Sequence, residues 1–396
     1  MNTTDAILIR PAIQHYAWGG KSYIPSWLHN SNKDSRPFAE AWFGDHPLAP
    51  AIVHGDHFNE PLNHWITKDP SGILGRESID IYGPRMPFLL KILDVHDMLS
   101  LQLHPTKQAA EYGYNREHDL QIPVDAPHRN YKDQNHKPEI LFALSDFWML
   151  QGFAPIEEIL YRFKSLIPEF AISLNPGWQS LMQAIWDLSG DSYLDYSKAL
   201  FNNLSDKNLS DKNQIYHWLS KAFKLYPPSL ESNDRGLLVM LLLKVQYLKP
   251  GQVGYQAPGV IHAYLEGQNV ELMANSDNVL RGGLTPKHID PAELIKHLDT
   301  DTSGQCLIKP MYLMDDEVAF NPPVNDFLLK HFKVKKGGIK FIQFNTVSVI
   351  LIKEGNLNFE NKMHGKGDSI FIPAYKQIQI ETVSDTSEYF LATSTL

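Results

Sequence analysis

The chain has 396 residues, of which 43% are hydrophobic and 20% are charged, and its formal net charge is −9. This length exceeds one ordinary hydrophobic core, so we expect a folded chain of two or three domains. The negative charge, with lysine and arginine scattered along the sequence, argues against a nucleic-acid binder but allows a small anionic substrate held by a few cations.

The sequence shows no sign of export or membrane insertion. Residues 1–10 lack the apolar core of a signal peptide, and the longest apolar run, residues 237–243, is far shorter than the ~20 residues that span a bilayer. The single cysteine, Cys306, argues against a disulfide framework and a cysteine-rich metal site. We therefore expect a cytoplasmic globular protein that binds neither membrane nor nucleic acid.

Two strands are expected in the first quarter of the chain. Residues 38–44 form a short strand, and residues 87–94 are a mostly apolar run bounded by proline, which is typical of a core strand. Lys91 lies inside this run. A lysine there either extends its amine to solvent or takes part in function, and the first case is the commoner one.

Residues 99–104 alternate leucine with polar residues, which is the period of a strand with one buried face. Gln102 and His104 therefore point to the same side, about 7 Å apart. A short helix follows over residues 105–118, and a long loop with several prolines follows over residues 119–138.

The pattern changes from strand to helix in the middle of the chain. Lys137 must be extended because it precedes a proline, and if a strand begins there, Lys137 and Glu139 lie on one face. From residue 155 to residue 243, apolar residues recur at the helical spacing. We expect a helical insert without chemistry of its own, which walls one side of a site or forms contacts.

A hairpin turn is expected at residues 266–269, after a strand-rich segment that contains His262. With the turn centred there, Tyr264 lies opposite Glu271, and cross-strand partners share a face. His262, Tyr264 and Glu271 would then line one surface. A polar loop and then a cationic loop, residues 281–287, follow this hairpin.

The last part of the chain, residues 321–396, consists of short strands and turns and carries a weak internal repeat. Gly251 opens a turn and strand that place His262 eleven residues later, and Gly367 opens a similar unit with Ile378 at the matching place. We interpret this as a duplicated β-barrel in which only the first copy kept a metal.

Four residues on expected strands form a candidate metal site: Gln102, His104, Glu139 and His262. Two imidazoles, a carboxylate and an amide oxygen suit Zn²⁺ or another first-row divalent ion, and they leave room for water or substrate. The spacing alone carries little weight in a chain with 17 histidines.

Six short blocks resemble the signature blocks of type I mannose-6-phosphate isomerases, and they occur in that family's order. The blocks are residues 16–19, 40–44, 102–105, 135–139, 258–265 and 276–287. The resemblance extends along most of the chain and is weakest in the helical insert.

The resemblance implies a mainly β protein with a cupin (jelly-roll, double-stranded β-helix) catalytic domain, an inserted α-helical domain and a second, cupin-like C-terminal domain without metal. The expected boundaries are 1–147 with 244–320 for the first, 148–243 for the second and 321–396 for the third. It also implies one Zn²⁺ per chain on the four candidate ligands, and it places the active-site arginine at Arg281.

The activity implied is the interconversion of mannose 6-phosphate and fructose 6-phosphate through an enediol. This needs a proton-transfer group, an electrophile and a grip on the phosphate, and zinc can orient and polarise the sugar. Glu271 is one candidate base, and Lys137 is another, because a lysine beside a metal ion can lose its proton. Arg281 can stabilise the enediolate or bind phosphate, whereas Lys287 is the candidate phosphate contact. The expected pocket lining is Tyr264, His136, Asp277 and Trp18.

Two other functions fit the same residues. His104, Glu139 and His262 could hold Fe(II) in a cupin dioxygenase, although Gln102 fills a position that O₂ would need. A non-catalytic cupin that binds metal and sugar would bind its ligand without turnover. A different sugar phosphate as the preferred substrate also stays open, and we expect a monomer.

Overall fold

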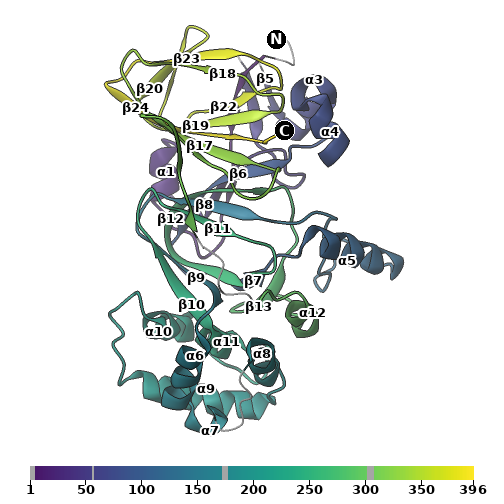
Figure 1. Cartoon of the computed structure of the whole chain (residues 1–396), viewed down its shortest axis with the longest axis vertical. Coiled ribbons are helices and arrows are strands. Elements are labelled where there is room, and N and C mark those ends of the chain that lie inside the picture. Colours follow the sequence, from purple (N-terminus) through teal and green to yellow (C-terminus); the bar gives the residue numbers. More distant parts are fainter. Residues whose placement is uncertain (1–4, 56–57, 172–176, 301–306) are drawn as a thin grey trace.

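The computed structural model describes residues 5–55, 58–171, 177–300 and 307–396. These residues form a mainly β structure with three sheets and a cluster of helices arranged along one long axis (Figure 1). The helices between residues 156 and 242 gather at one end, and the C-terminal strands lie at the other. The largest sheet occupies the middle.

The middle sheet has eleven strands within the described residues. They are β2 (Ala12–Gln14), β3 (Glu40–Phe43), β6 (Phe88–Val95), β7 (Leu101–Leu103), β8 (Glu139–Ala143), β9 (Phe147–Phe153), β10 (Leu243–Leu248), β11 (Val253–Gln256), β12 (His262–Ala274), β13 (Leu280–Gly283) and β14 (Leu307–Ile308). The main path runs β14-β11-β8-β12-β6-β3-β2, and β7, β9, β10 and β13 join it through β12. The strands expected at residues 38–44, 87–94 and 99–104 are confirmed by β3, β6 and β7.

The predicted hairpin at residues 266–269 is wrong. β12 is one strand that bends at Gly267, whose φ of +125° favours glycine. Before the bend β12 pairs with β7 and β9, and after it β12 pairs with β6 and β8. The bend still brings the expected side chains together, because the Tyr264 hydroxyl donates to Glu271 Oε2 over 2.9 Å.

Two further sheets contain the C-terminal strands. The larger has the order β15-β16-β17-β24-β19-β22-β1-β4-β5, and the smaller has the order β18-β23-β20-β21. Their bounds are β1 (Ile7–Arg10), β4 (Ile52–Gly55), β5 (Phe58–Pro61), β15 (Met311–Met314), β16 (Glu317–Phe320), β17 (Leu328–Lys335), β18 (Ile339–Ile342), β19 (Ser348–Glu354), β20 (Asn356–Phe359), β21 (Lys362–Gly365), β22 (Ser369–Ile372), β23 (Ile378–Thr382) and β24 (Thr386–Thr393). β1 pairs with β22, so N-terminal strands complete a sheet of the C-terminal part.

The helical segment lies between β9 and β10. It comprises α6 (Ile156–Leu166), α7 (Pro168–Ala171), α8 (Trp178–Trp186), α9 (Gly190–Leu204), α10 (Ile215–Leu225), α11 (Gly236–Val239) and the 3₁₀ turn η1 (Met240–Leu242). Its apolar stripes pack around the buried Trp218, and the same core includes Leu101 of β7 and Leu150 of β9. The segment therefore shares a hydrophobic core with the strands that carry the candidate site.

The other helices are short and lie beside the sheets. They are α1 (Tyr23–Trp27), α2 (Leu62–Thr67), α3 (Pro70–Leu74), α4 (Arg76–Tyr82), α5 (Lys107–Asp119) and α12 (Pro291–Lys296), and α5 confirms the helix expected at residues 105–118. Across the described residues, no helix has both the length and the apolar character that crossing a bilayer requires. Cys306 lies outside the described residues.

Candidate metal centre and active site

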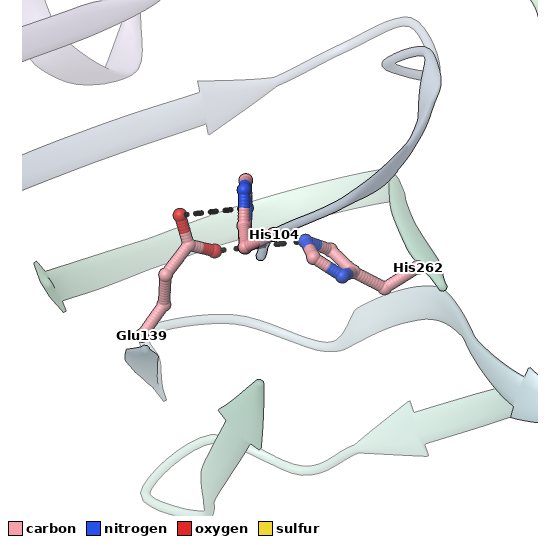
Figure 2. A group of neighbouring side chains, drawn as sticks. All are labelled: His104, Glu139 and His262. Carbon is pink, nitrogen blue, oxygen red and sulfur yellow. Dashed lines mark ion pairs between the residues drawn. The ribbon is translucent and has the colours of Figure 1, made fainter. Parts of the chain in front are cut away.

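Three side chains that could hold a metal ion meet inside the middle sheet. One ligand atom each of His104, Glu139 and His262 lies within 4.8 Å of the others, and all three residues are buried. Glu139 Oε1 is 3.3 Å from Nε2 of His104, and Glu139 Oε2 is 3.7 Å from Nε2 of His262. Figure 2 shows the carboxylate pointing toward both rings.

The fold fixes both imidazole rings through their other nitrogen. Nδ1 of His104 is 2.8 Å from the carbonyl oxygen of Asn278, and Nδ1 of His262 is 2.9 Å from that of Val260. A carbonyl oxygen only accepts, so each Nδ1 carries the proton and each Nε2 presents a lone pair. Neither Nε2, nor Oε2 of Glu139, has a hydrogen-bond partner among the described residues. Buried lone pairs that converge without a donor are what a divalent cation needs.

The charges at the cluster match this geometry. Burial lowers the pKa of His262 to about 4, and it also lowers the pKa of His104, so both rings are neutral near pH 7. Burial opposes the ionisation of Glu139, but Lys137 and the two imidazoles outweigh it and hold that pKa well below its usual range. Two neutral imidazoles and one carboxylate form a common donor set for zinc.

Gln102 and Arg281 lie in the same cross-strand row as His262. Gln102 of β7 is the direct partner of His262 on β12 and also of Arg281 on β13. Directly opposed residues of antiparallel strands point to the same face. The row therefore places an amide and a guanidinium beside the histidine cluster. Burial lowers the pKa of Arg281, whose guanidinium forms no hydrogen bond or ion pair with the described residues.

Comparison with known proteins gives one consistent result. The profile of the family described as phosphomannose isomerase type I, catalytic domain, matches residues 7–156. Mannose-6-phosphate isomerase from Escherichia coli (strain K12) is 36% identical over 327 residues, which cover 80% of this chain and 81% of that protein. The chain belongs to the mannose-6-phosphate isomerase family. The enzyme of that name from Rattus norvegicus is 32% identical over 382 residues, which cover 87% of this chain and 86% of that protein.

Solved structures of family members share the whole fold. A zinc-bound holo form of mannose 6-phosphate isomerase superposes with a TM-score of 0.87 at 29% identity and covers 99% of this chain and all (100%) of that chain. A mutant of phosphomannose isomerase from Salmonella typhimurium gives a TM-score of 0.88 at 28% identity, with the same coverage. The zinc bound by that family member is consistent with the buried cluster of two histidines and a glutamate in this chain.

A second buried cluster adjoins the candidate metal ligands. Lys91 Nζ lies 3.1 Å from Glu271 Oε1 and 3.6 Å from Glu40 Oε2, and Glu271 also accepts from Tyr264. Burial raises the pKa of Glu271 to about 7. Burial alone would lower the pKa of Lys91, but the carboxylates of Glu40 and Glu271 outweigh it and raise that pKa. The carboxylate of Glu139 contributes to the raised pKa of Glu271, so this cluster and the candidate cation site influence each other electrostatically.

Sequence reasoning did not assign Lys91 or Glu40 to the site. The interpretation of Lys91 as a solvent-directed side chain is wrong, because the residue is 7% exposed and its amine points to carboxylates. A signal was present, since a lysine in a strand buried on both faces must have a buried counter-charge. Its counter-ion Glu40, from β3, lies in one of the blocks that resemble the family.

The other predicted residues lie in different surroundings, and one of them, His136, contacts the C-terminal part. Lys137 Nζ is 3.1 Å from Glu139 Oε1, and burial and the nearby charge of Arg281 lower the pKa of Lys287. Asp277, whose side chain is half-exposed, pairs with His46 over 2.9 Å. Trp18 packs against the buried cluster that includes Tyr264. His136 instead pairs over 3.1 Å with Asp326, just before β17, and so contacts the C-terminal part.

Proposed function

We propose that this chain is a zinc-dependent mannose-6-phosphate isomerase, which interconverts mannose 6-phosphate and fructose 6-phosphate. The observation that carries the proposal is the buried His104–Glu139–His262 cluster, in an enzyme family whose zinc-bound member matches 99% of this chain. The comparisons favour neither the Fe(II) dioxygenase nor the non-catalytic alternative.

The donor set supports zinc with four protein ligands: Gln102, His104, Glu139 and His262. The amide of Gln102 completes the set, because Gln102 lies directly opposite His262 on the same face. When bound, zinc would supply Lewis-acid chemistry by orienting sugar oxygens and polarising the carbonyl.

The chain's own groups would move the proton and hold the charges. Glu271 is our candidate base, because a carboxyl whose pKa is raised to about 7 both takes up and releases a proton near neutral pH. Lys137, beside the ligand Glu139, is the second candidate. Arg281 would stabilise the charge that develops on the enediolate, and Lys287 would hold the phosphate.

Four further residues are proposed as pocket lining. Tyr264 supports this role through its bond to Glu271, Asp277 through its ion pair with His46, and Trp18 through its packing against the cluster that includes Tyr264. His136 is the weakest member of the set, since its ring faces Asp326.

For the fold, we propose a catalytic cupin domain (1–147 with 244–320), an inserted helical domain (148–243) and a cupin-like C-terminal domain (321–396). The insert is supported by the described elements between β9 and β10, which are all helical. The C-terminal unit requires β1, β4 and β5 from the first segment, because they lie in its sheet. We further propose a cytoplasmic monomer, with one zinc ion per chain and no nucleic acid or membrane as partner.

The test is an assay of the purified chain on mannose 6-phosphate, with zinc measured in the same sample. We expect fructose 6-phosphate to form, the rate to fall on chelation and the rate to return with zinc. Glucose 6-phosphate serves as the comparison substrate for specificity. A zinc-loaded sample that binds mannose 6-phosphate without converting it would overturn the proposal, and so would faster turnover of another sugar phosphate.

A further inference from the structure

One carboxylate of the helical segment bonds the loop that follows Arg281. Oδ1 of Asp234 accepts from the backbone N–H of Leu284 over 3.0 Å, and Oδ2 accepts from that of Thr285 over 2.8 Å. Oδ1 also accepts from the N–H of Gly236 over 2.6 Å, which fixes the carboxylate at the start of α11. A charged acceptor shared by three N–H groups is a strong, directional anchor.

The two backbones touch at this anchor. A Cβ atom on Gly236 would come within 2.4 Å of the Leu284 nitrogen, and one on Gly283 would come within 2.4 Å of the Gly236 Cα. Leu284 has a φ of +56°, which a non-glycine residue adopts only when its surroundings hold it there. The contacts with Asp234 and Gly236 are what hold this turn.

Arg281 and Lys287 are anchored differently. Arg281 belongs to β13, which pairs with β7 from Leu280 to Gly283, so the sheet fixes its backbone. Lys287 lies beyond the sheet, in an exposed stretch that borders a cavity of about 470 Å³ next to Asp234. Beyond Gly283, the path of the loop therefore depends on Asp234.

We propose that Asp234 is a positioning residue that sets the path of the Lys287 loop and so couples the helical segment to the grip on the substrate phosphate. This rests on the proposed function. It gives the helical segment a role in substrate affinity, whereas Arg281 and the metal ligands keep their places through the sheet.

The test compares Asp234→Asn with the unchanged chain. The amide keeps one acceptor and turns an NH₂ group toward a backbone N–H, so the loop loses at least one bond. We expect KM for mannose 6-phosphate to rise roughly tenfold, with kcat within about twofold and zinc content unchanged. Gly236→Ala keeps the Asp234 side chain but places a Cβ atom 2.4 Å from the Leu284 nitrogen and 2.8 Å from Asp234 Oδ1, so it disturbs the same anchor and should give the same pattern. The matched control is Asp211→Asn, which makes the same charge change at a carboxylate of the helical segment that, among the described residues, accepts only from the Asn213 N–H, and it should leave KM unchanged.

Two further measurements make the outcome decisive. In the Lys287→Ala background, Asp234→Asn should raise KM little further, because the group that it positions is gone. An unchanged KM in Asp234→Asn, a loss confined to kcat, or independent effects in the double variant would overturn the proposal.

Affinity for inorganic phosphate, measured by calorimetry on zinc-loaded protein, needs no turnover. An unchanged chain that binds phosphate but does not isomerise the sugar would refute the proposed function, while the effect of Asp234→Asn on phosphate affinity still decides this inference.

Discussion

Each histidine of the candidate metal centre uses one ring nitrogen for the fold and leaves the other for a ligand. The Nδ1 bonds of His104 and His262 go to carbonyl oxygens of loops, so the loops set the tautomer and the ring angle. Removing either ring takes away a candidate ligand, while the hydrophobic cores of the helical segment and of the C-terminal strands keep all their residues. Chemistry and folding are therefore separable at this site.

His262→Ala tests the metal ligands. We expect zinc affinity to fall by at least about 10²-fold and isomerase activity to be lost, because one of four donors is gone. The melting temperature should change less than zinc affinity does, because the hydrophobic cores of the helical segment and of the C-terminal strands keep all their residues. The control is His217→Ala in α10, whose Nδ1 bonds the Leu209 carbonyl and which should keep zinc and turnover. Full zinc occupancy with unchanged turnover in His262→Ala would remove the site as described.

Arg281 and Lys287 separate chemistry from grip. A phosphate contact acts alike in the ground and transition states, so Lys287→Ala should mainly raise KM. A group that meets charge only as it develops should affect kcat, so Arg281→Ala should lower kcat on the order of 10²-fold with zinc retained. Steady-state kinetics on both variants decides this. If Arg281→Ala changes KM alone, Arg281 is a phosphate clamp, and Glu271 or Lys137 carries the proton transfer without it.

At the scale of elements, β12 decides the site. Residues before its bend bring His262 to the row of β7, and residues after it bring Glu271 to Lys91 on β6. Because Gly267 bends one continuous strand, the candidate metal ligand His262 and the candidate base Glu271 lie on a single strand.

Gly267→Ala should break this element. A Cβ atom there would lie 2.5 Å from the Asp146 carbonyl oxygen at a φ of +125°, so we expect a loss of about 2 kcal/mol or more in unfolding free energy. Zinc affinity should fall as well. Gly251→Ala is the matched control: its φ is +88°, but nothing lies within 4 Å, so only the backbone strain is added. Equal losses in chemical denaturation for both variants would show that the bend is not tightly packed.

Glu388 links three strands of the C-terminal sheet and predicts a pH dependence. Its carboxylate on β24 lies 2.9 Å from His331 of β17 and 2.8 Å from Lys353 of β19. Burial opposes ionisation, but these partners outweigh it and lower the pKa of Glu388 to about 2. Because the pKa of Glu388 is lower in the folded state than in the unfolded state, its ionised carboxylate stabilises the fold at any pH above the unfolded-state pKa. This stabilisation is lost as the pH falls toward 2.

Glu388→Gln should therefore lower the melting temperature at pH 6 by about 2–4 °C and have a smaller effect at pH 3. The control is Glu381→Gln on β23, which forms no ion pair with the described residues and should leave both melting temperatures unchanged. A loss from Glu388→Gln that is equal at both pH values would mean that shape, not charge, matters there.

At the scale of the whole molecule, the described residues hold one candidate cation site, and it lies in the middle sheet. The described residues contain a single group of histidine, cysteine or carboxylate side chains close enough to share an ion. Ile378, the counterpart of His262 in the weak repeat, is buried and pairs with Ile342 in the small sheet. The second unit has apolar packing at this place.

Elemental analysis should therefore find one zinc ion per chain, and His262→Ala should have lost most of it. The physical reason is that an apolar side chain at the place of Ile378 offers no lone pair. A second stoichiometric ion that persists in His262→Ala and is lost on changing residues within 321–396 would contradict this.

The sequence by itself determined the local elements and most of the candidate site. The alternation in residues 99–104 predicted that Gln102 and His104 face one way, and the motif blocks pointed to Glu139, His262 and Arg281. Local rules of periodicity and proline geometry suffice for the direction of Gln102 and His104 because they involve only neighbours along the chain. The assignment of Arg281 rested instead on the resemblance to the family.

Tertiary structure alone decided the long-range pairings. Local rules allow either a hairpin or a bent strand at Gly267, and only pairing with β6, β7, β8 and β9 selects the bent strand. The same holds for Lys91, whose carboxylate partners come from β3 and β12, and for β1, which completes a sheet formed by the other end of the chain. Asp234 reaches Leu284 across 50 residues. Contacts of this kind depend on which surfaces can be buried together, and no local pattern in the sequence specifies that.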